Sequence, residues 1–89
     1  MNLQQCLAAA DEIEKKYLIP RGAIVERSET GRNLSHLRWM IQEMRTYGPQ
    51  NESKAMRWLG YIQGSLVWNY YCSLDDMKKL SARHSDGAA

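Results

Sequence analysis

The sequence predicts an all-α protein, a small bundle of three to four helices. Apolar residues recur at spacings of three and four in several separate stretches, which is the period of amphipathic helices. Proline and glycine separate these stretches, at Pro20 and Gly22 and again at Gly48 and Pro49, and both residue types end helices. The chain has 89 residues, of which 44% are hydrophobic, so we expect one helical domain over 1–89.

The first helix is expected at about 3–17, after Asn2 as N-cap. One face of this helix carries Leu3, Cys6, Leu7, Ala10, Ile13 and Tyr17. Because Cys6 belongs to that apolar face, we interpret it as a packing residue and not as a reactive thiol. Pro20 and Gly22 then end the helix.

The segment 20–33 is expected to be irregular. Its residues 23–25 are compatible with a short extended piece, and its residues 28–33 are typical of a turn. The segment brings arginines and glutamates together, namely Arg21, Arg27 and Arg32 beside Glu26 and Glu29. We interpret it as a solvated loop of mixed charge, with a recognition loop as the alternative.

The second helix is expected at about 34–47, with an apolar face made of Leu34, Leu37, Met40, Ile41 and Met44. Trp39 points to the other side of this helix. His36 has no acidic or thiol partner at metal-ligand spacing, so we interpret it as structural.

The third helix, at about 53–71, is the longest predicted element. The short connection 48–51 makes it an antiparallel neighbour of the second helix, so the two form a central hairpin. Its core face is expected to hold Ala55, Leu59, Ile62, Leu66 and Tyr70. We expect Leu59, Ile62 and Leu66 to pack against the apolar face of the second helix.

Two glycines in the third helix, Gly60 and Gly64, require an explanation, because a glycine inside a helix costs about 0.5–1 kcal/mol relative to alanine. They predict a groove in which another helix lies close. That helix is either the first or fourth helix of the same chain, or a partner chain, a second copy included. The candidate protein-binding surface consists of Trp39, Arg57, Gly60, Tyr61, Gly64, Trp68 and Tyr71.

A short fourth helix is expected at about 74–83, with Ser73 as N-cap and the acidic pair Asp75 and Asp76 in its first turn. The remaining acidic pairs are expected on solvated helix faces. The sequence leaves open whether Cys6 and Cys72 lie close together.

Several function classes find no support in the sequence. No phosphate-binding loop, nucleophile elbow or zinc-protease motif is present, so we expect no enzyme, no cofactor and no metal site. The net charge of +2 comes from interleaved charges, and the turn at 48–51 does not suit a helix-turn-helix motif. The sequence contains neither the pattern of a signal peptide nor a membrane span, so we expect a cytoplasmic protein with reduced thiols.

Three sequence motifs resemble those of a known group of proteins. HLRWM stands at 36–40, KAMRWLGYIQGSLVW at 54–68 and SLDDMKKL at 73–80. These residues resemble small accessory proteins of tailed phages and prophages, which pair a motif like HLRWM with one like KAMRWLGxxQGxLW. In this chain Val67 intervenes before Trp68. The resemblance covers about half of the chain, implies a bacterial host cytoplasm and implies no particular mechanism.

Two functional hypotheses follow. The first is a helical interaction module that binds a bacterial host or phage protein, with homodimerisation as a further possibility. The second is a small nucleic-acid-associated phage regulator that uses Arg21, Arg27, Arg32, Lys54 and Arg57.

Overall fold

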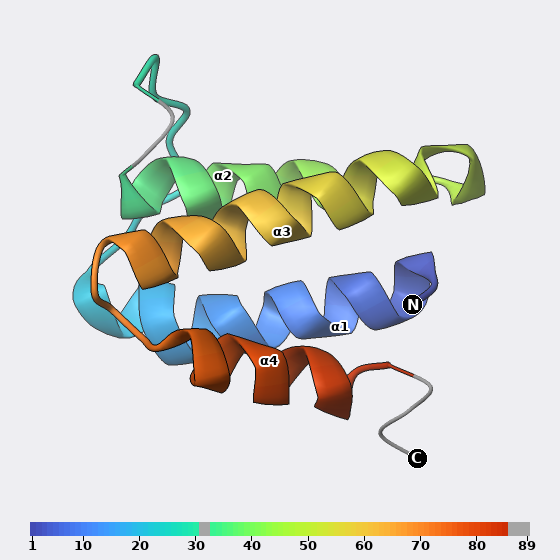
Figure 1. Cartoon of the computed structure of the whole chain (residues 1–89). Coiled ribbons are helices and arrows are strands. Elements are labelled where there is room, and N and C mark those ends of the chain that lie inside the picture. The colour runs from blue at the N-terminus through green and yellow to red at the C-terminus, as the bar shows by residue number, and fades with distance from the viewer. Residues whose placement is uncertain (31–32, 86–89) are drawn as a thin grey trace.

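The computed structural model describes residues 1–30 and 33–85, and all regular structure in these ranges is helical. Its α-helices are α1 (Leu3–Ile13), α2 (Leu34–Met44), α3 (Glu52–Trp68) and α4 (Leu74–Arg83). Consecutive helices run in opposite directions, with α2 and α3 in one layer and α1 and α4 in the other (Figure 1). The predicted helical bundle is therefore confirmed, including an antiparallel pair formed by the second and third helices.

The helical run that begins with α1 is longer than α1 itself. Asn2 starts it with a capping box, in which its side chain accepts a 2.8 Å hydrogen bond from the Gln5 amide. A π-helical turn at Glu14–Leu18 and a 3-10 turn at Ile19–Arg21 continue it. Gly22, with a φ of 79°, ends the run where the sequence predicts.

The core lies between the layers and is centred on α1. Ala9 and Ala10 are completely buried, and their small side chains allow α3 to approach α1 closely, so α3 packs mainly against α1. Leu59, Ile62 and Leu66 share one buried core with Leu37, Met40, Ile41 and Met44 of α2, so the predicted contact with α2 is present and α1 is a further, closer neighbour of α3. The bulky rings of Trp39 and Trp58, 6.1 Å apart, lie between α2 and α3. The core consists of Cys6, Ala9, Ala10, Ile13, Tyr17, Leu18, Ala23, Leu37, Met40, Ile41, Met44, Ala55, Leu59, Ile62, Leu66, Met77 and Leu80.

Tyr70 does not join the core, contrary to the prediction. The helix ends at Trp68, and Tyr70 has a φ of 63°, in the left-handed region. Its amide donates to Val67 O at 3.1 Å, and the Tyr71 amide donates to Leu66 O at 3.0 Å. This pair of hydrogen bonds is a Schellman motif, which reverses the chain direction and leaves Tyr70 95% exposed.

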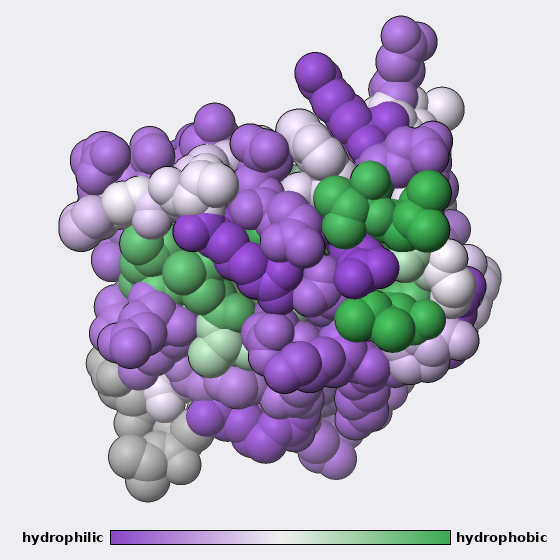
Figure 2. Space-filling model, turned by 180° about the vertical axis from the view of Figure 1, so that it is seen from behind, coloured by the Kyte–Doolittle hydropathy of each residue, from purple (hydrophilic) through white to green (hydrophobic). Residues whose placement is uncertain are grey.

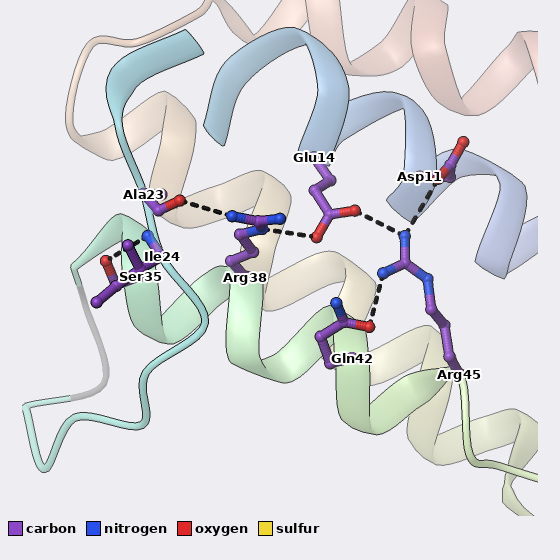
Figure 3. Close-up of polar contacts among 8 residues, drawn as sticks. All are labelled: Asp11, Glu14, Ala23, Ile24, Ser35, Arg38, Gln42 and Arg45. Atoms are coloured by element: carbon purple, nitrogen blue, oxygen red, sulfur yellow. Dashed lines mark hydrogen bonds and ion pairs between the residues drawn. The ribbon is translucent and has the colours of Figure 1, made fainter. Parts of the chain in front are cut away.

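The segment after Gly22 runs beside the start of α2. The Ile24 amide donates a 3.1 Å hydrogen bond to Ser35 Oγ (Figure 3). Ile19, Ile24 and Val25 are exposed. Seen from behind, hydrophobic residues form separate patches between hydrophilic ones, two of them beside the part of the chain that projects from the bundle (Figure 2).

Candidate functional site: a groove between α3 and α4

An open groove lies between α3 and α4 and has a volume of about 650 Å³. We call it the α3–α4 groove. It is lined by Gly60, Gln63, Gly64, Val67, Trp68, Tyr70, Leu74, Met77, Lys78 and Ser81. Most of these side chains are apolar or aromatic, and Lys78 is the one charged residue among them.

The two glycines of α3 line this groove without being covered. A Cβ atom built on Gly60 or on Gly64 would meet no atom within 4 Å among the described residues. The alternative in which the first or fourth helix of the same chain packs on them is therefore wrong. The α4 helix lies beside the glycines and forms one side of the groove instead of its cover.

A capping box sets the start of α4, and contacts with α3 and α1 hold the helix beside the glycines. Ser73 and Asp76 form a capping box at its start, in which each side chain accepts a hydrogen bond from the other residue's amide, at 2.9 and 3.0 Å. Further along, Gln63 Nε2 of α3 donates a 2.8 Å hydrogen bond to Ser81 Oγ of α4. At the far end, Arg83 and His84 both contact the carboxylate of Glu12 in α1.

Large side chains at the edge of the groove are exposed to an unusual degree. Trp68 is 78% exposed, Tyr70 95% and Leu74 59%. Trp68 is the last residue of α3 and lies on a face that points away from the core. The Schellman motif, with Tyr70 as its left-handed residue, turns the chain before Tyr70 can pack against the core. Exposed large apolar side chains that gather beside a hollow are typical of interaction surfaces.

A second hollow of about 320 Å³ lies on the other side of Trp68. It is lined by Tyr61, Gly64, Ser65, Trp68 and Asn69, so Gly64 and Trp68 belong to both hollows. The structure thus brings together four predicted surface residues, Gly60, Gly64, Tyr61 and Trp68. Arg57 is exposed one turn before them on α3.

Two other predicted surface residues lie elsewhere. Tyr71 lies beneath the guanidinium of Arg21, 4.9 Å from its ring centroid. Trp39 belongs to an aromatic cluster with His36, Tyr47 and Trp58, in which neighbouring ring centroids are 5.3 to 6.1 Å apart. Tyr61 also lines a hollow of about 380 Å³ beside this cluster, so it lies between the two regions.

Cations lie over the aromatic cluster. The guanidinium of Arg27 is 5.4 Å from the Trp39 ring centroid. The ammonium of Lys54 is 5.3 Å from the Tyr47 ring and 5.2 Å from the Trp58 ring. Such cation–π contacts are favourable and give this face of α2 and α3 a positive charge.

His36 anchors the irregular segment to that cluster. Its Nδ1 accepts a 3.0 Å hydrogen bond from the Ser28 amide. Burial, and then the nearby charge of Arg27, lower the pKa of His36 from its ordinary value. A neutral imidazole that accepts a backbone hydrogen bond is consistent with the structural role predicted for this residue.

Sequence reasoning missed three residues of the groove edge and the aromatic cluster, namely Tyr70, Leu74 and Trp58. Tyr70 was assigned to the core face of the third helix, and Leu74 was given no role beyond the predicted fourth helix. A signal for Trp58 was present, because HLRWM and KAMRWL each contain an Arg-Trp pair, at 38–39 and 57–58.

Sequence reasoning also missed a buried ionic network around Glu14, a residue that the sequence analysis did not single out. Glu14 is buried and accepts hydrogen bonds from Arg38 Nε at 3.0 Å and from Arg45 at 2.8 Å (Figure 3). Arg38 also donates to Ala23 O at 2.8 Å, and Arg45 to Asp11 at 3.1 Å. Burial alone raises the pKa of Glu14, but the hydrogen bonds and charges of Arg45 and Arg38 outweigh it and lower the pKa. The network joins the helical run that begins with α1 to α2. None of its residues lines the α3–α4 groove.

The two cysteines are free thiols. Cys6 is completely buried, as the packing interpretation requires, and burial raises the pKa of its thiol to about 11. In residues 1–30 and 33–85 no group of three or more His, Cys, Asp or Glu side chains is placed to hold a metal ion. No helix of the described part of the chain is both long and apolar enough to cross a membrane.

Comparison with known proteins adds no family assignment. No protein-family model, curated protein or solved structure matches the chain. The resemblance to phage and prophage accessory proteins stays a prediction, and the candidate function rests on the groove itself.

Proposed function

We propose that this protein is a helical interaction module whose α3–α4 groove binds another protein. One observation carries the proposal: Gly60 and Gly64 leave an uncovered groove directly beside the exposed ring of Trp68. A helix interior does not favour glycine, and water does not favour a tryptophan face, so both features are costly in the isolated chain. Both become favourable when a second protein fills the groove and covers the ring.

The chemistry of the groove edge suits such a role. Trp and Tyr are enriched among the residues that contribute most to protein–protein binding, because they bury a large area and lose little rotamer entropy. The helix end and its Schellman motif hold the backbone of Trp68 and Tyr70, so a partner does not have to order the backbone there when it binds.

The resemblance of residues 34–80 to phage and prophage accessory proteins supports a particular setting. In that setting the partner is a bacterial host or phage protein in the bacterial cytoplasm. Binding in the groove inhibits the partner or redirects it, and the module itself needs no catalytic group or cofactor.

Affinity purification from bacterial lysate, followed by mass spectrometry, tests the proposal. We expect Trp68→Ala and Tyr61→Ala to lose a partner that the wild-type protein retains, while circular dichroism and the melting temperature stay nearly unchanged. Ile24→Ala is the matched control, because Ile24 is also a large exposed apolar residue but lies outside the groove. Trp68 lines the groove and Tyr61 lines the hollow on the other side of Trp68, so a partner that both variants retain contradicts the proposal. Unfolding of both variants also contradicts it, because it assigns these residues to the core.

A second candidate function, association with single-stranded nucleic acid, is favoured by the aromatic cluster. Arg27 and Lys54, two of the basic residues named for this role, lie over the cluster's rings. Stacking aromatic residues beside cations is the chemistry of sequence-tolerant single-strand binding. Arg21 lies over Tyr71 instead, and Arg32 lies outside the described residues.

The salt dependence of binding tests this second candidate. Binding to phosphates weakens steeply as salt rises, so a mobility-shift assay at about 50 mM salt gives it the most favourable conditions. A shift that Trp39→Ala and Lys54→Gln both weaken supports nucleic-acid association. The absence of a mobility shift at that salt concentration contradicts nucleic-acid association.

A further inference from the structure

We propose that the segment bound in the α3–α4 groove is an amphipathic α-helix with Asp or Glu residues flanking its apolar face. This inference rests on the proposed function, since it names the chemistry of the partner for the same groove. It is carried by three features of the groove: its helical sides, its glycines and its charges.

The first feature favours a helical partner over an extended one. Both sides of the groove are α-helices, whose backbone groups are bonded within α3 and α4. An extended peptide would therefore find no strand edge with which to pair its own amides and carbonyls. A helix brings its backbone hydrogen bonds with it, so it enters an apolar groove without unpaired backbone groups.

The second feature sets where the partner helix crosses. Gly60 and Gly64 are one turn apart on α3, and the space above both is empty among the described residues. A ridge of side chains spaced by four residues packs into such a depression when two helices cross. Trp68, one further turn along the same face, then lies against the side of the partner helix instead of in water.

The third feature is a local excess of positive charge. Lys78 lines the groove and Arg57 lies one turn before Gly60, and neither has an ionic partner among residues 1–30 and 33–85. On α4, Asp75 pairs with Lys79 at 2.9 Å, and Asp76 accepts from the Ser73 amide in the capping box. A partner with carboxylates on each side of its apolar face complements Arg57 and Lys78.

The same charges make a second copy of this chain the less suitable occupant. A twofold dimer through the groove would bring Arg57 and Lys78 of both copies into one interface. Like charges in an interface weaken association, so the charge pattern favours a different, acidic chain.

A display library of helix-forming peptides tests the inference. Each peptide has about 18 residues, or ~27 Å of helix, an apolar face drawn from Leu, Ile, Ala and Gly, and flanking positions drawn equally from Glu, Lys and Gln. Selection is performed on the full-length protein, on Gly64→Leu, which fills the groove, and on the double variant Arg57→Glu, Lys78→Glu. Circular dichroism verifies that both variants fold.

We expect Glu to exceed Lys about three- to tenfold at the flanking positions of peptides selected on the wild-type protein, as one or two ion pairs imply. We also expect this preference to reverse on the double variant and the selection to fail on Gly64→Leu. Groove-dependent peptides without a charge preference overturn the inference and leave the proposed function intact. If no peptide is selected on the wild-type protein, or if the selected peptides also bind Gly64→Leu, the result counts against the proposed function itself.

Sedimentation at two protein concentrations tests whether a second copy of the chain occupies the groove. We expect a monomer at both concentrations. A dimer that Gly64→Leu dissociates overturns the inference, because the groove is then occupied by a second copy of the chain.

Discussion

Gly22 and Tyr70 occupy the same backbone position at the ends of two different helical segments. Both are in the left-handed region, with φ angles of 79° and 63°, and both belong to Schellman motifs. In the first motif the Ala23 amide donates to Leu18 O at 3.1 Å, and in the second the Tyr71 amide donates to Leu66 O at 3.0 Å. Glycine accepts this conformation without strain, whereas a residue with a Cβ does not.

Tyr70→Gly is therefore expected to stabilise the protein. The left-handed conformation costs a non-glycine residue about 1–2 kcal/mol, and the added freedom of glycine in the unfolded chain offsets part of the gain. We expect a net gain of about 0.5–1 kcal/mol in the free energy of unfolding, measured by urea denaturation. Gly22→Ala is the matched control and should destabilise; a Tyr70→Gly variant that unfolds more easily would show that the Tyr70 ring holds the turn.

Gly64→Ala is expected to stabilise the isolated protein and to weaken partner binding. The added methyl group meets no atom within 4 Å, so the gain in helix propensity, about 0.5–1 kcal/mol, is obtained without a clash. Thermal melting measures the first effect and co-purification of the partner the second. Gly60→Ala should behave in the same way. If either substitution lowers the melting temperature, the glycine is covered within the folded chain.

Glu14→Gln is expected to destabilise the protein by about 1–3 kcal/mol at neutral pH, because Arg38 and Arg45 lose a buried charged acceptor. Urea denaturation of both proteins measures the difference, with the exposed Glu29→Gln as control.

The same substitution predicts a pH dependence. The pKa of Glu14 is lower in the folded protein than its ordinary value of 4.5. The unfolded chain therefore binds the proton first, and this part of the stability is present above pH 4.5 and lost as the pH falls through the folded pKa. The difference between wild type and Glu14→Gln should shrink in that acidic range. A difference that does not change with pH would contradict the ionic role of Glu14.

The two thiols are expected to differ in their reaction with iodoacetamide at neutral pH. Burial raises the pKa of both Cys6 and Cys72, but Cys6 is completely buried, with a pKa of about 11, whereas Cys72 is half-buried. A rise of about two units in pKa leaves on the order of 100-fold less thiolate, the reactive form. Mass spectrometry over time should therefore find Cys72 modified first and Cys6 modified only when urea is present. Equal rates would contradict the buried position of Cys6.

The sequence allowed most of the helices to be predicted, since the signals involved are local. Asn2 and Ser73 are N-caps in the structure, and the first helical run ends at Gly22, as the composition indicates. The predicted end of the third helix was three residues too late. The helical spacing of apolar residues continues through Tyr70, but the Schellman motif turns the chain before Tyr70 can join the core. The left-handed position of this motif holds Tyr70 and not glycine, so the sequence lacks the usual signal for a helix end.

The candidate site was predicted only in part. Gly60, Tyr61, Gly64 and Trp68 were placed together correctly, because residues at helical spacing on one helix share a face whatever packs around it. Leu74 and Met77 come from α4, so their place in the groove depends on how α4 packs. Trp39 was assigned to the same candidate protein-binding surface but lies away from the groove, in the aromatic cluster with Trp58.

The sequence by itself determined that this protein is all-helical, where its helices begin and which faces of them are apolar. These properties depend on residues within a few positions of one another, through backbone hydrogen bonds, caps and the helical period. Only the tertiary structure decided that α3 packs on α1, that Glu14 is buried between Arg38 and Arg45, and that Gly60 and Gly64 remain uncovered. These outcomes depend on contacts between residues far apart in the chain, and small side chains such as Ala9 and Ala10 determine which helices can approach closely.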